Sequence, residues 1–280
     1  MNPFLIALLL TCISPEGTVP LRVSPMGDVT SPTSLTVAPV ARKLVWADEF
    51  TKPGLPDPAR WAYETGGSGF GNNELQYYTD RRAENARIEG GNLIIEARKE
   101  NYQGKNYTSA RLITKGKADW AYGRIEVRAK LPKGVGTWPA IWMLGQNISK
   151  VGWPLCGEID IMEHVGFDEG VVHGTVHTGA YNHRQHTEKG GLITISDVTM
   201  AFHVYAVEWT AEQINFLVDD KTYFSFDKKT NGNSEAQWPF DQPFYLLLNL
   251  AVGGNWGGQK GVDETIWPQR MEVDYVRVYQ

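Results

Sequence analysis

The sequence predicts an all-β fold, a sandwich of two antiparallel sheets. From residue 42 onward, short apolar alternations are separated by turns rich in Gly, Pro, Asn and Asp, which is typical of antiparallel strands joined by tight connections. No window carries the period of an amphipathic helix, and no internal repeat indicates a propeller or a solenoid.

The spacing of apolar residues predicts individual strands. Residues 123–131 alternate between apolar and charged side chains, so we expect a strand with one face in the core and the other in water. Residues 244–252 are almost all apolar and are bounded by Pro and Gly, which favours a strand buried on both faces. The turn residues at 90–92 and at 219–221 predict two hairpins.

The first 41 residues differ in composition from the rest. Residues 1–14 contain the apolar run Phe4–Leu10, which is too short to span a bilayer, so we expect an export signal and a secreted, extracellular protein. The alternative is a bacterial lipoprotein signal, with Cys12 lipidated and the protein attached to a membrane at the cell surface or in the periplasm. Residues 15–41, rich in Pro, Ser and Thr, are expected to form an extended tether, and residues 42–280 a folded domain.

Composition excludes one class of partner. The formal net charge is -5, and acidic and basic residues are mixed along the chain, so no basic patch is available for nucleic acid. The 10 Trp, 12 Tyr and 10 Phe include candidates for sugar-stacking platforms, although we expect most of them in the core. With Cys12 in the leader, the two cysteines form no disulfide framework, and Cys156 is expected to be a free thiol.

Three carboxylates lie close together in the segment GEIDIMEHVG, residues 157–166. Glu158 and Asp160 are two residues apart and therefore share one face of a strand. A regular strand would place Glu163 on the other face, but one extra residue, bulged at Met162, returns it to the same face. The α-carbons of the two glutamates then lie ~13 Å apart, and inward-leaning side chains bring the carboxyl groups to ~5.5 Å, the separation of a retaining glycosidase.

The same spacing also fits the charged face of an exposed edge strand. However, Trp138, Trp142 and Trp153 lie nearby in the sequence, and neighbouring strands would add His177 and Trp256. Aromatic rings beside carboxylates are typical of a groove that binds a sugar polymer.

The segment GEIDIMEH resembles the signature of glycoside hydrolase family 16, in its laminarinase-like branch. The likeness covers residues 42–280 and includes the segments WADEF, GNNELQYYT, TWPAIWML, LNLAVGGNWGG and the C-terminal MEVDYVRVYQ. It implies a β-jelly-roll sandwich of two antiparallel sheets with an open concave substrate cleft. Residues 42–280 would then be a catalytic domain for endo-hydrolysis of β-1,3-linked or mixed β-1,3/1,4-linked glucan, without a catalytic cofactor. We expect a monomer whose partner is the polysaccharide.

The resemblance also implies roles for single residues. Glu158 would be the nucleophile that forms a glycosyl-enzyme intermediate, Glu163 the acid that protonates the leaving oxygen, and Asp160 an assisting group between them. Spacing alone does not decide which glutamate has which role. The implied substrate-binding residues are Asn72, Glu74, Arg111, Trp138, Trp142, His177 and Trp256. Of the two tryptophans four residues apart, one could equally be a core residue.

A structural calcium ion is a further implication of the resemblance. Its ligands would be the Glu49 carboxylate, the Gly91 carbonyl and the Asp274 carboxylate, on the side away from the cleft. Oxygen ligands suit calcium. From the sequence alone, these groups fit ordinary surface positions equally well.

Other functions fit the sequence less well. His173 and His177 have a spacing known from zinc sites on helices, but on a strand they lie ~13 Å apart. A serine hydrolase is excluded because no G-x-S-x-G segment is present. A non-catalytic β-glucan-binding protein on the same fold would typically lack the catalytic acids.

The substrate is the closer alternative, because related enzymes cleave lichenan, agarose or carrageenan. GNNELQYYT and GGNWGG favour β-1,3-glucan. Residues 182–191 and 228–238 are polar and irregular, and we expect them to shape the ends of the cleft.

Overall fold

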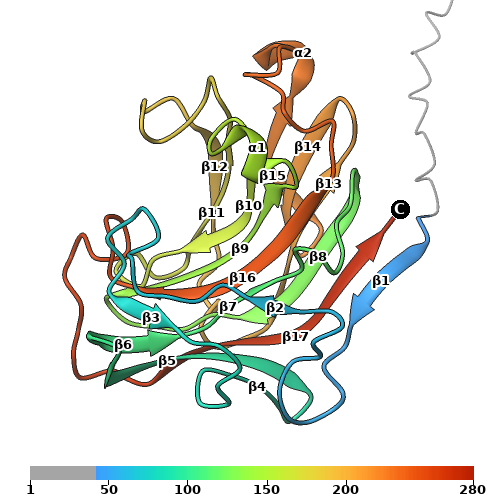
Figure 1. Cartoon of the computed structure of the whole chain (residues 1–280). Coiled ribbons are helices and arrows are strands. Elements are labelled where there is room, and N and C mark those ends of the chain that lie inside the picture. The colour runs from blue at the N-terminus through green and yellow to red at the C-terminus, as the bar shows by residue number, and fades with distance from the viewer. Residues whose placement is uncertain (1–41) are drawn as a thin grey trace, which may run out of the picture. The chain divides into compact units, whose positions relative to one another are not determined.

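The computed structural model describes residues 42–280, which fold into two β-sheets packed face to face (Figure 1). The predictions for residues 1–14, for the tether at 15–41 and for Cys12 lie outside the described residues. The two sheets confirm the predicted all-β jelly-roll sandwich.

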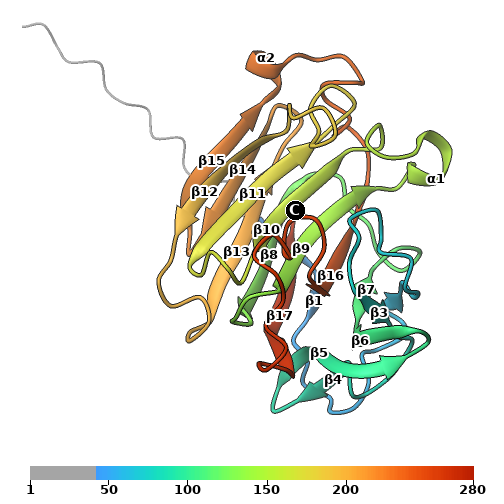
Figure 2. The same ribbon diagram turned by 90° about the vertical axis from the view of Figure 1, so that its left-hand side faces the viewer.

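The seven-stranded sheet has the order β12-β11-β10-β9-β16-β7-β2. Figure 2 shows β12, β11, β10, β9 and β16 side by side. Its strands are β12 Lys189–Thr194, β11 Val171–His177, β10 Glu158–His164, β9 Thr137–Gly145, β16 Phe244–Val252, β7 Arg111–Ile113 and β2 Ala62–Tyr63.

The ten-stranded sheet has the order β15-β14-β13-β8-β17-β5-β6-β3, with β1 beside β17 and β4 beside β5. Its pairs are antiparallel except at one edge, where β3 runs parallel to β6, in contrast to the predicted purely antiparallel arrangement. Its strands are β15 Lys221–Asp227, β14 Gln213–Val218, β13 His203–Trp209, β8 Gly123–Lys130, β17 Gln269–Tyr279, β5 Asn92–Tyr102, β6 Lys105–Ser109, β3 Gln76–Tyr78, β1 Leu44–Asp48 and β4 Ala86–Glu89.

The hydrophobic core lies between the two sheets and follows the predicted alternations. In β8, Ile125 and Val127 are fully buried in it, and every residue of β16 is buried. The charged face of β8 is less exposed than expected, because Arg124 pairs with Glu126 at 2.7 Å and Glu126 is only 7% exposed. Ion pairing between neighbouring side chains thus replaces much of the expected contact with water.

Both predicted hairpins form two-residue turns. Asp219 and Asp220, with φ of 49° and 63°, join β14 to β15, while Gly90 and Gly91, with φ of 59° and 81°, join β4 to β5. Two consecutive residues with positive φ give the turn a twist that matches the flanking strands.

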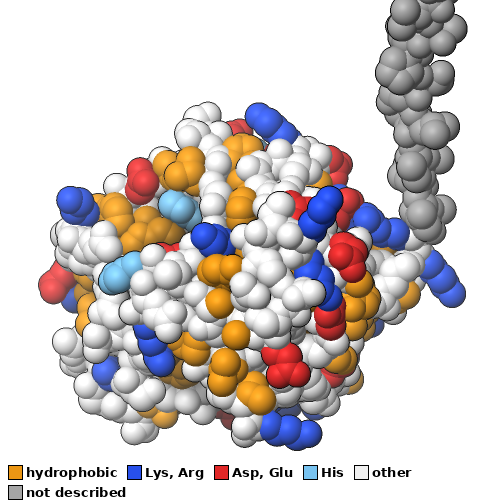
Figure 3. All heavy atoms as spheres, turned by 90° about the horizontal axis from the view of Figure 1, so that it is seen from above, with side chains coloured by type: hydrophobic (Ala, Val, Ile, Leu, Met, Phe, Trp, Pro, Cys, Tyr) orange, Lys and Arg blue, Asp and Glu red, His pale blue; other side chains and the backbone are white. Residues whose placement is uncertain are grey.

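Helices are a minor part of the described residues. Two short helices occur there, α1 at Ile148–Val151 and α2 at Lys228–Asn231. Within residues 42–280 no helix has the length and apolar character needed to cross a membrane. Seen from above in Figure 3, acidic and basic side chains are interspersed over this face.

Candidate active site

A bulge in β10 creates the candidate active site. Asp160 pairs with Trp142 of β9, but the next residue of β9, Ile141, pairs with Met162, so Ile161 is an extra residue in β10. On the other side, Asp160 and Glu163 pair with Thr175 and His173 of β11, again with two residues opposite one. The predicted bulge is confirmed and involves both Ile161 and Met162.

The bulge sorts the side chains of β10 between core and cleft. Ile159, Ile161 and Met162 are fully buried in the core between the sheets. Glu158, Asp160 and Glu163 all line a pocket on the opposite face of the seven-stranded sheet. A strand without the extra residue would point Glu163 into the core.

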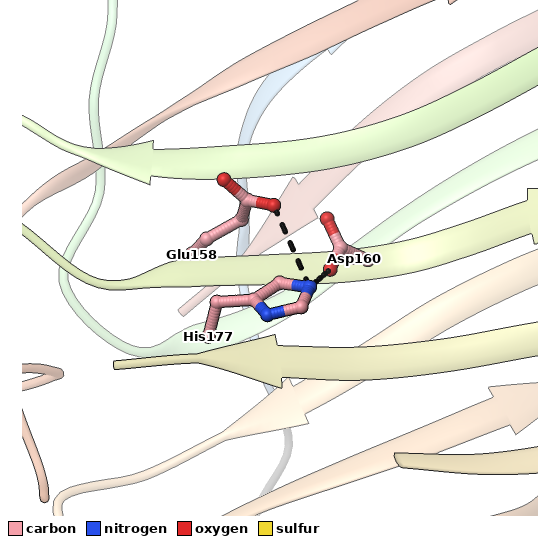
Figure 4. A group of neighbouring side chains, drawn as sticks. All are labelled: Glu158, Asp160 and His177. Carbon is pink, nitrogen blue, oxygen red and sulfur yellow. Dashed lines mark ion pairs between the residues drawn. The ribbon is translucent and has the colours of Figure 1, made fainter. Parts of the chain in front are cut away.

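His177 of β11 completes the acidic cluster (Figure 4). Its Nε2 atom lies 3.3 Å from Oδ2 of Asp160 and 3.9 Å from Oε1 of Glu158. Asp160 is only 3% exposed, and its Oδ2 has no hydrogen-bond partner. These three residues are also the one group of His, Cys, Asp and Glu side chains in residues 42–280 whose ligand atoms lie close enough to share a metal ion.

Burial makes ionisation of these carboxyl groups unfavourable. It raises the pKa of Glu158 to about 8, with the charge of Asp160 as the second cause. It raises the pKa of Glu163 to about 7, an effect that His177 opposes, and that of Asp160 well above its usual value. Protons are therefore held in this cluster near neutral pH. Burial raises the pKa of both glutamates, so the electrostatics do not tell the nucleophile from the acid, and that assignment rests on the family pattern.

Each of the two glutamates, Glu158 and Glu163, accepts a hydrogen bond from an indole. Trp153 Nε1 donates to Oε2 of Glu158 at 2.8 Å, and Trp138 Nε1 donates to Oε1 of Glu163 at 3.0 Å. Trp153 belongs to the segment between α1 and β10, whereas Trp138 belongs to β9. The two carboxylates are thus held from different parts of the chain.

The pocket around the acids has a volume of about 250 Å³ and contains most of the predicted substrate-binding residues. Both Trp138 and Trp142 line it, so neither is purely a core residue. Trp256 does not line it and instead packs edge-on against Trp138, with ring centroids 5.6 Å apart. The predicted residues that line the pocket are Asn72, Glu74, Arg111, Trp138 and Trp142, together with the three acids.

Arg111 and Trp142 form one wall of the pocket. The guanidinium of Arg111 lies 4.5 Å from the Trp142 ring centroid and 2.7 Å from a carboxylate oxygen of Glu64. Glu64 was not predicted, because only the fold brings it beside Arg111. The Glu64 carboxylate and the face of the Trp142 ring therefore both attract the Arg111 cation.

A chain of hydrogen bonds runs from this wall to Glu74. Trp142 Nε1 donates to Oδ1 of Asn249 at 2.7 Å, and Nδ2 of Asn249 donates to the Tyr78 hydroxyl at 3.1 Å. Tyr78 in turn donates to Oε2 of Glu74 at 3.1 Å, and Gln76 donates to the same oxygen at 2.7 Å. Asn249 was missed by sequence reasoning. A polar residue within the apolar run 244–252 was the available signal.

The loop that begins at residue 182 contributes to the pocket as predicted. His183 and Arg184 line it, and the Arg184 guanidinium lies 4.6 Å from the Trp153 ring centroid. His173 pairs with Glu163 across the sheet but is not part of the group that Glu158, Asp160 and His177 form, and its ring packs against Trp256 with centroids 4.9 Å apart. The His173–His177 zinc alternative therefore gains no support from the geometry.

The predicted calcium ligands lie where three strands meet. Asp274 follows the part of β17 that pairs with β5, and precedes the part that pairs with β1. Gly91 is in the turn before β5, and Glu49 directly follows β1. Both carboxylates have arginine partners: Glu49 bonds with both oxygens to Arg277, at 2.8 and 2.9 Å, and Asp274 bonds to Arg128 at 2.5 Å.

Cys156, the cysteine among the described residues, is a free thiol as predicted. It is fully buried beside the active-site strand, and burial raises its pKa to about 12.

Comparison with known proteins places this site in a family. Residues 73–277 match the model of glycosyl hydrolases family 16. The chain is 59% identical over 243 residues to a β-glucanase from Rhodothermus marinus, with 85% of each protein covered. The X-ray structure of the laminarinase from Rhodothermus marinus is similar, with a TM-score of 0.83 and 58% identity over 85% of this chain and 97% of that one.

A second solved structure is that of SCLam, described as a non-specific endo-β-1,3(4)-glucanase of family 16. It has a TM-score of 0.82 and 53% identity, and it covers 86% of this chain and 92% of its own. The likeness first indicated by GEIDIMEH is confirmed along most of the domain, and the chain belongs to glycosyl hydrolase family 16.

Proposed function

We propose that this protein hydrolyses β-1,3-glucan, and mixed β-1,3/1,4-glucan as a second substrate, by endo-attack with retention of configuration. The observation that carries the proposal is the bulge in β10, which brings Glu158, Asp160 and Glu163 together in a pocket with tryptophans. The similarity to the Rhodothermus laminarinase and to SCLam, a non-specific endo-β-1,3(4)-glucanase, supports this choice of substrate and the mixed-linkage addition.

The reaction proceeds in two displacements. In the first, a carboxylate oxygen of Glu158 forms a bond to the anomeric carbon, while the bond from that carbon to the glycosidic oxygen breaks and this oxygen takes the proton of Glu163. In the second, Glu163 takes a proton from water, the water oxygen bonds to the anomeric carbon, and the bond to Glu158 breaks. Asp160, buried beside Glu158 and His177, assists between the two glutamates, because its raised pKa lets it hold a proton while Glu158 is ionised.

The decisive experiment compares the full chain with Glu158→Gln and Glu163→Gln on laminarin, lichenan and agarose, following reducing ends and product sizes. We expect short oligosaccharides from laminarin, no turnover by Glu158→Gln, and a roughly 10²- to 10⁴-fold loss for Glu163→Gln. Glu264→Gln is the matched control, because the Glu264 side chain is 69% exposed and contacts Lys99 outside the pocket.

Two results would contradict the proposal. Binding of laminarin without cleavage by the unmodified protein would indicate a glucan-recognition protein. Cleavage of agarose, with none of laminarin or lichenan, would move the protein to another substrate class within the family.

The proposal includes a structural calcium ion held by Glu49, Gly91 and Asp274. The three groups offer oxygen ligands, and Asp274 lies within β17 between the part that pairs with β5, which follows Gly91, and the part that pairs with β1, which precedes Glu49. A cation here competes with Arg277 for Glu49. We expect a chelator to lower the Tm by roughly 5 °C and calcium to restore it. An unchanged Tm after chelation would remove the ion from the proposal.

The proposal also includes export and a monomeric state. Residues 1–14 direct secretion, with lipidation of Cys12 as the alternative that would keep the protein on a membrane. Intact-mass measurement of the recovered protein separates a cleaved soluble form from a diacylated one. Sedimentation of the full chain at 31.3 kDa is expected for a monomer, and a mass of twice that value would contradict it.

A further inference from the structure

The two indole hydrogen bonds to the catalytic glutamates have a chemical direction. An indole N–H donates and never accepts, so the oxygen that it contacts must act as an acceptor. Trp153 fixes Oε2 of Glu158 in this way, and Trp138 fixes Oε1 of Glu163. One oxygen of each carboxylate is therefore engaged, and the other is left for the reaction.

Both rings are held in place by their neighbours. Trp138 is 9% exposed and packs edge-on against Trp256, at an interplanar angle of 78°. Trp153 contacts the imidazole of His183, with ring centroids 4.8 Å apart, and the guanidinium of Arg184, 4.6 Å from its ring centroid. Rings fixed in this way direct their N–H groups at the carboxylates with little freedom to turn away.

The neighbouring indole of Trp142 is bonded differently. It lines the same pocket, but its N–H donates to Asn249 and not to a carboxylate. Three tryptophans, Trp138, Trp142 and Trp153, thus line the same pocket. Within residues 42–280, only the N–H groups of Trp138 and Trp153 donate to a catalytic glutamate.

Given the proposed function, we propose that Trp153 and Trp138 are positioning residues that orient the nucleophile and the acid, respectively. Trp153 holds Glu158 so that Oε1 faces the anomeric carbon. Trp138 holds Glu163 so that the proton resides on Oε2 and faces the glycosidic oxygen. Each indole acts through the glutamate that it contacts, in addition to any contact of its ring with sugar.

The two roles separate according to the leaving group of the substrate. Glycosyl transfer from a dinitrophenyl glycoside needs no proton, because dinitrophenolate is a stable anion. A defect in the acid therefore slows laminarin hydrolysis but leaves kcat/KM for 2,4-dinitrophenyl β-laminaribioside nearly unchanged. A defect in the nucleophile slows both.

The test uses Trp153→Phe, Trp138→Phe and the matched control Trp142→Phe in the full chain, because phenylalanine keeps an aromatic ring and removes the N–H. Losing a hydrogen bond to the ionised Glu158 corresponds to roughly a ten- to one-hundred-fold loss in rate, and losing one to the protonated Glu163 to roughly a two- to ten-fold loss. We expect the larger loss on both substrates for Trp153→Phe and the smaller loss on laminarin alone for Trp138→Phe. Trp142→Phe should change both substrates by a common factor.

A second readout separates nucleophile positioning from weaker binding. The 2-deoxy-2-fluoro form of the dinitrophenyl glycoside accumulates the covalent adduct on the nucleophile, and its saturating inactivation rate does not depend on affinity. Trp153→Phe should lower that rate about ten-fold or more, whereas Trp138→Phe and Trp142→Phe should not. Mass spectrometry gives the fraction of protein molecules that form the adduct, so the measured rate can be corrected for any misfolded fraction of a variant.

The outcomes distinguish this inference from the proposed function. If the unmodified protein neither cleaves laminarin nor forms an adduct on Glu158, the proposed function fails. If it does both, and Trp153→Phe reacts with the fluoroglycoside at an unchanged rate, the positioning role of Trp153 is wrong. A loss on both substrates for Trp138→Phe would equally overturn the role given to Trp138.

Discussion

Removal of the Tyr78 hydroxyl is the sharpest test of the buried hydrogen-bond chain beneath the cleft. Tyr78 is fully buried, donates to Glu74 and accepts from Asn249. Tyr78→Phe deletes both bonds and keeps the ring. Glu74 then retains Gln76 as its close donor, while Nδ2 of Asn249 loses its acceptor in a site that is 6% exposed.

The expected destabilisation depends on pH. Loss of the neutral bond and of the acceptor for Asn249 costs about 2 kcal/mol in the free energy of unfolding. Burial raises the pKa of Glu74, and the Tyr78 hydrogen bond opposes that rise, so the variant raises the pKa further. An acid with a raised folded-state pKa binds more protons when folded, so its contribution to stability falls as pH rises. If the variant raises the pKa of Glu74 by one further unit, the loss in free energy of unfolding grows by about 1.4 kcal/mol at pH values above that raised pKa.

We therefore expect Tyr78→Phe to cost about 2 kcal/mol at pH 4 and about 3 kcal/mol at pH 8. Urea unfolding at the two pH values measures both differences. Tyr205→Phe is the matched control, because the Tyr205 hydroxyl is buried in the same sandwich and has no hydrogen-bond partner. Its substitution should cost little at either pH. Equal costs of Tyr78→Phe at the two pH values would refute the link to ionised Glu74.

Three further perturbations test the site and its support. In the folded protein, Cys156 should not react with a thiol reagent at pH 8, because the thiol is buried and burial raises its pKa to about 12. In denaturant it should react fully. Fast labelling of the native protein would contradict its burial. Gly174→Ala should cost about 1–3 kcal/mol in urea unfolding and lower activity, because a Cβ there would collide with the Tyr223 hydroxyl behind the bulged strand. Arg111→Lys should raise the KM for laminarin roughly ten-fold with a smaller change in kcat, because lysine has no guanidinium to lie over the Trp142 ring; an unchanged KM would exclude that wall from substrate binding.

The sequence contained the local part of this structure. The turns at Gly90-Gly91 and Asp219-Asp220 followed from residue types that tolerate positive φ, and the strand at 123–131 followed from its two-residue period. The return of Glu163 to the face of Asp160 was also local, because it needed one extra residue within β10. In each case the determining residues lie within about ten positions of one another.

The partners of the site residues were not predictable in this way. Asn249 and its donor Trp142 are 107 residues apart and meet because β16 and β9 are neighbours. Glu64 meets Arg111 through the pairing of the short strand β2 with β7. The order of the strands within a sheet decides which distant residues meet. Because that order is not readable from one sequence, the sequence indicates the types of residue in the site but not their partners. Trp153 differs from these partners because it lies only five residues before Glu158 in the sequence. The direction of its N–H group nevertheless depends on the conformation of the loop that leads into β10.

The bulge in β10 explains why stability and catalysis are coupled here. A regular strand would bury Ile161 but not Met162; the added residue sends Met162 into the core as well, where burial of this one large apolar side chain stabilises the fold by about 1.5–3 kcal/mol. The same residue turns Glu163 toward Asp160, and the close burial of these carboxyl groups is unfavourable for folding at neutral pH. The apolar gain on one face of the strand thus offsets the electrostatic strain on the other. Removing the extra residue should therefore abolish activity and also shift the apolar register, so a deletion at this position should not yield a more stable protein.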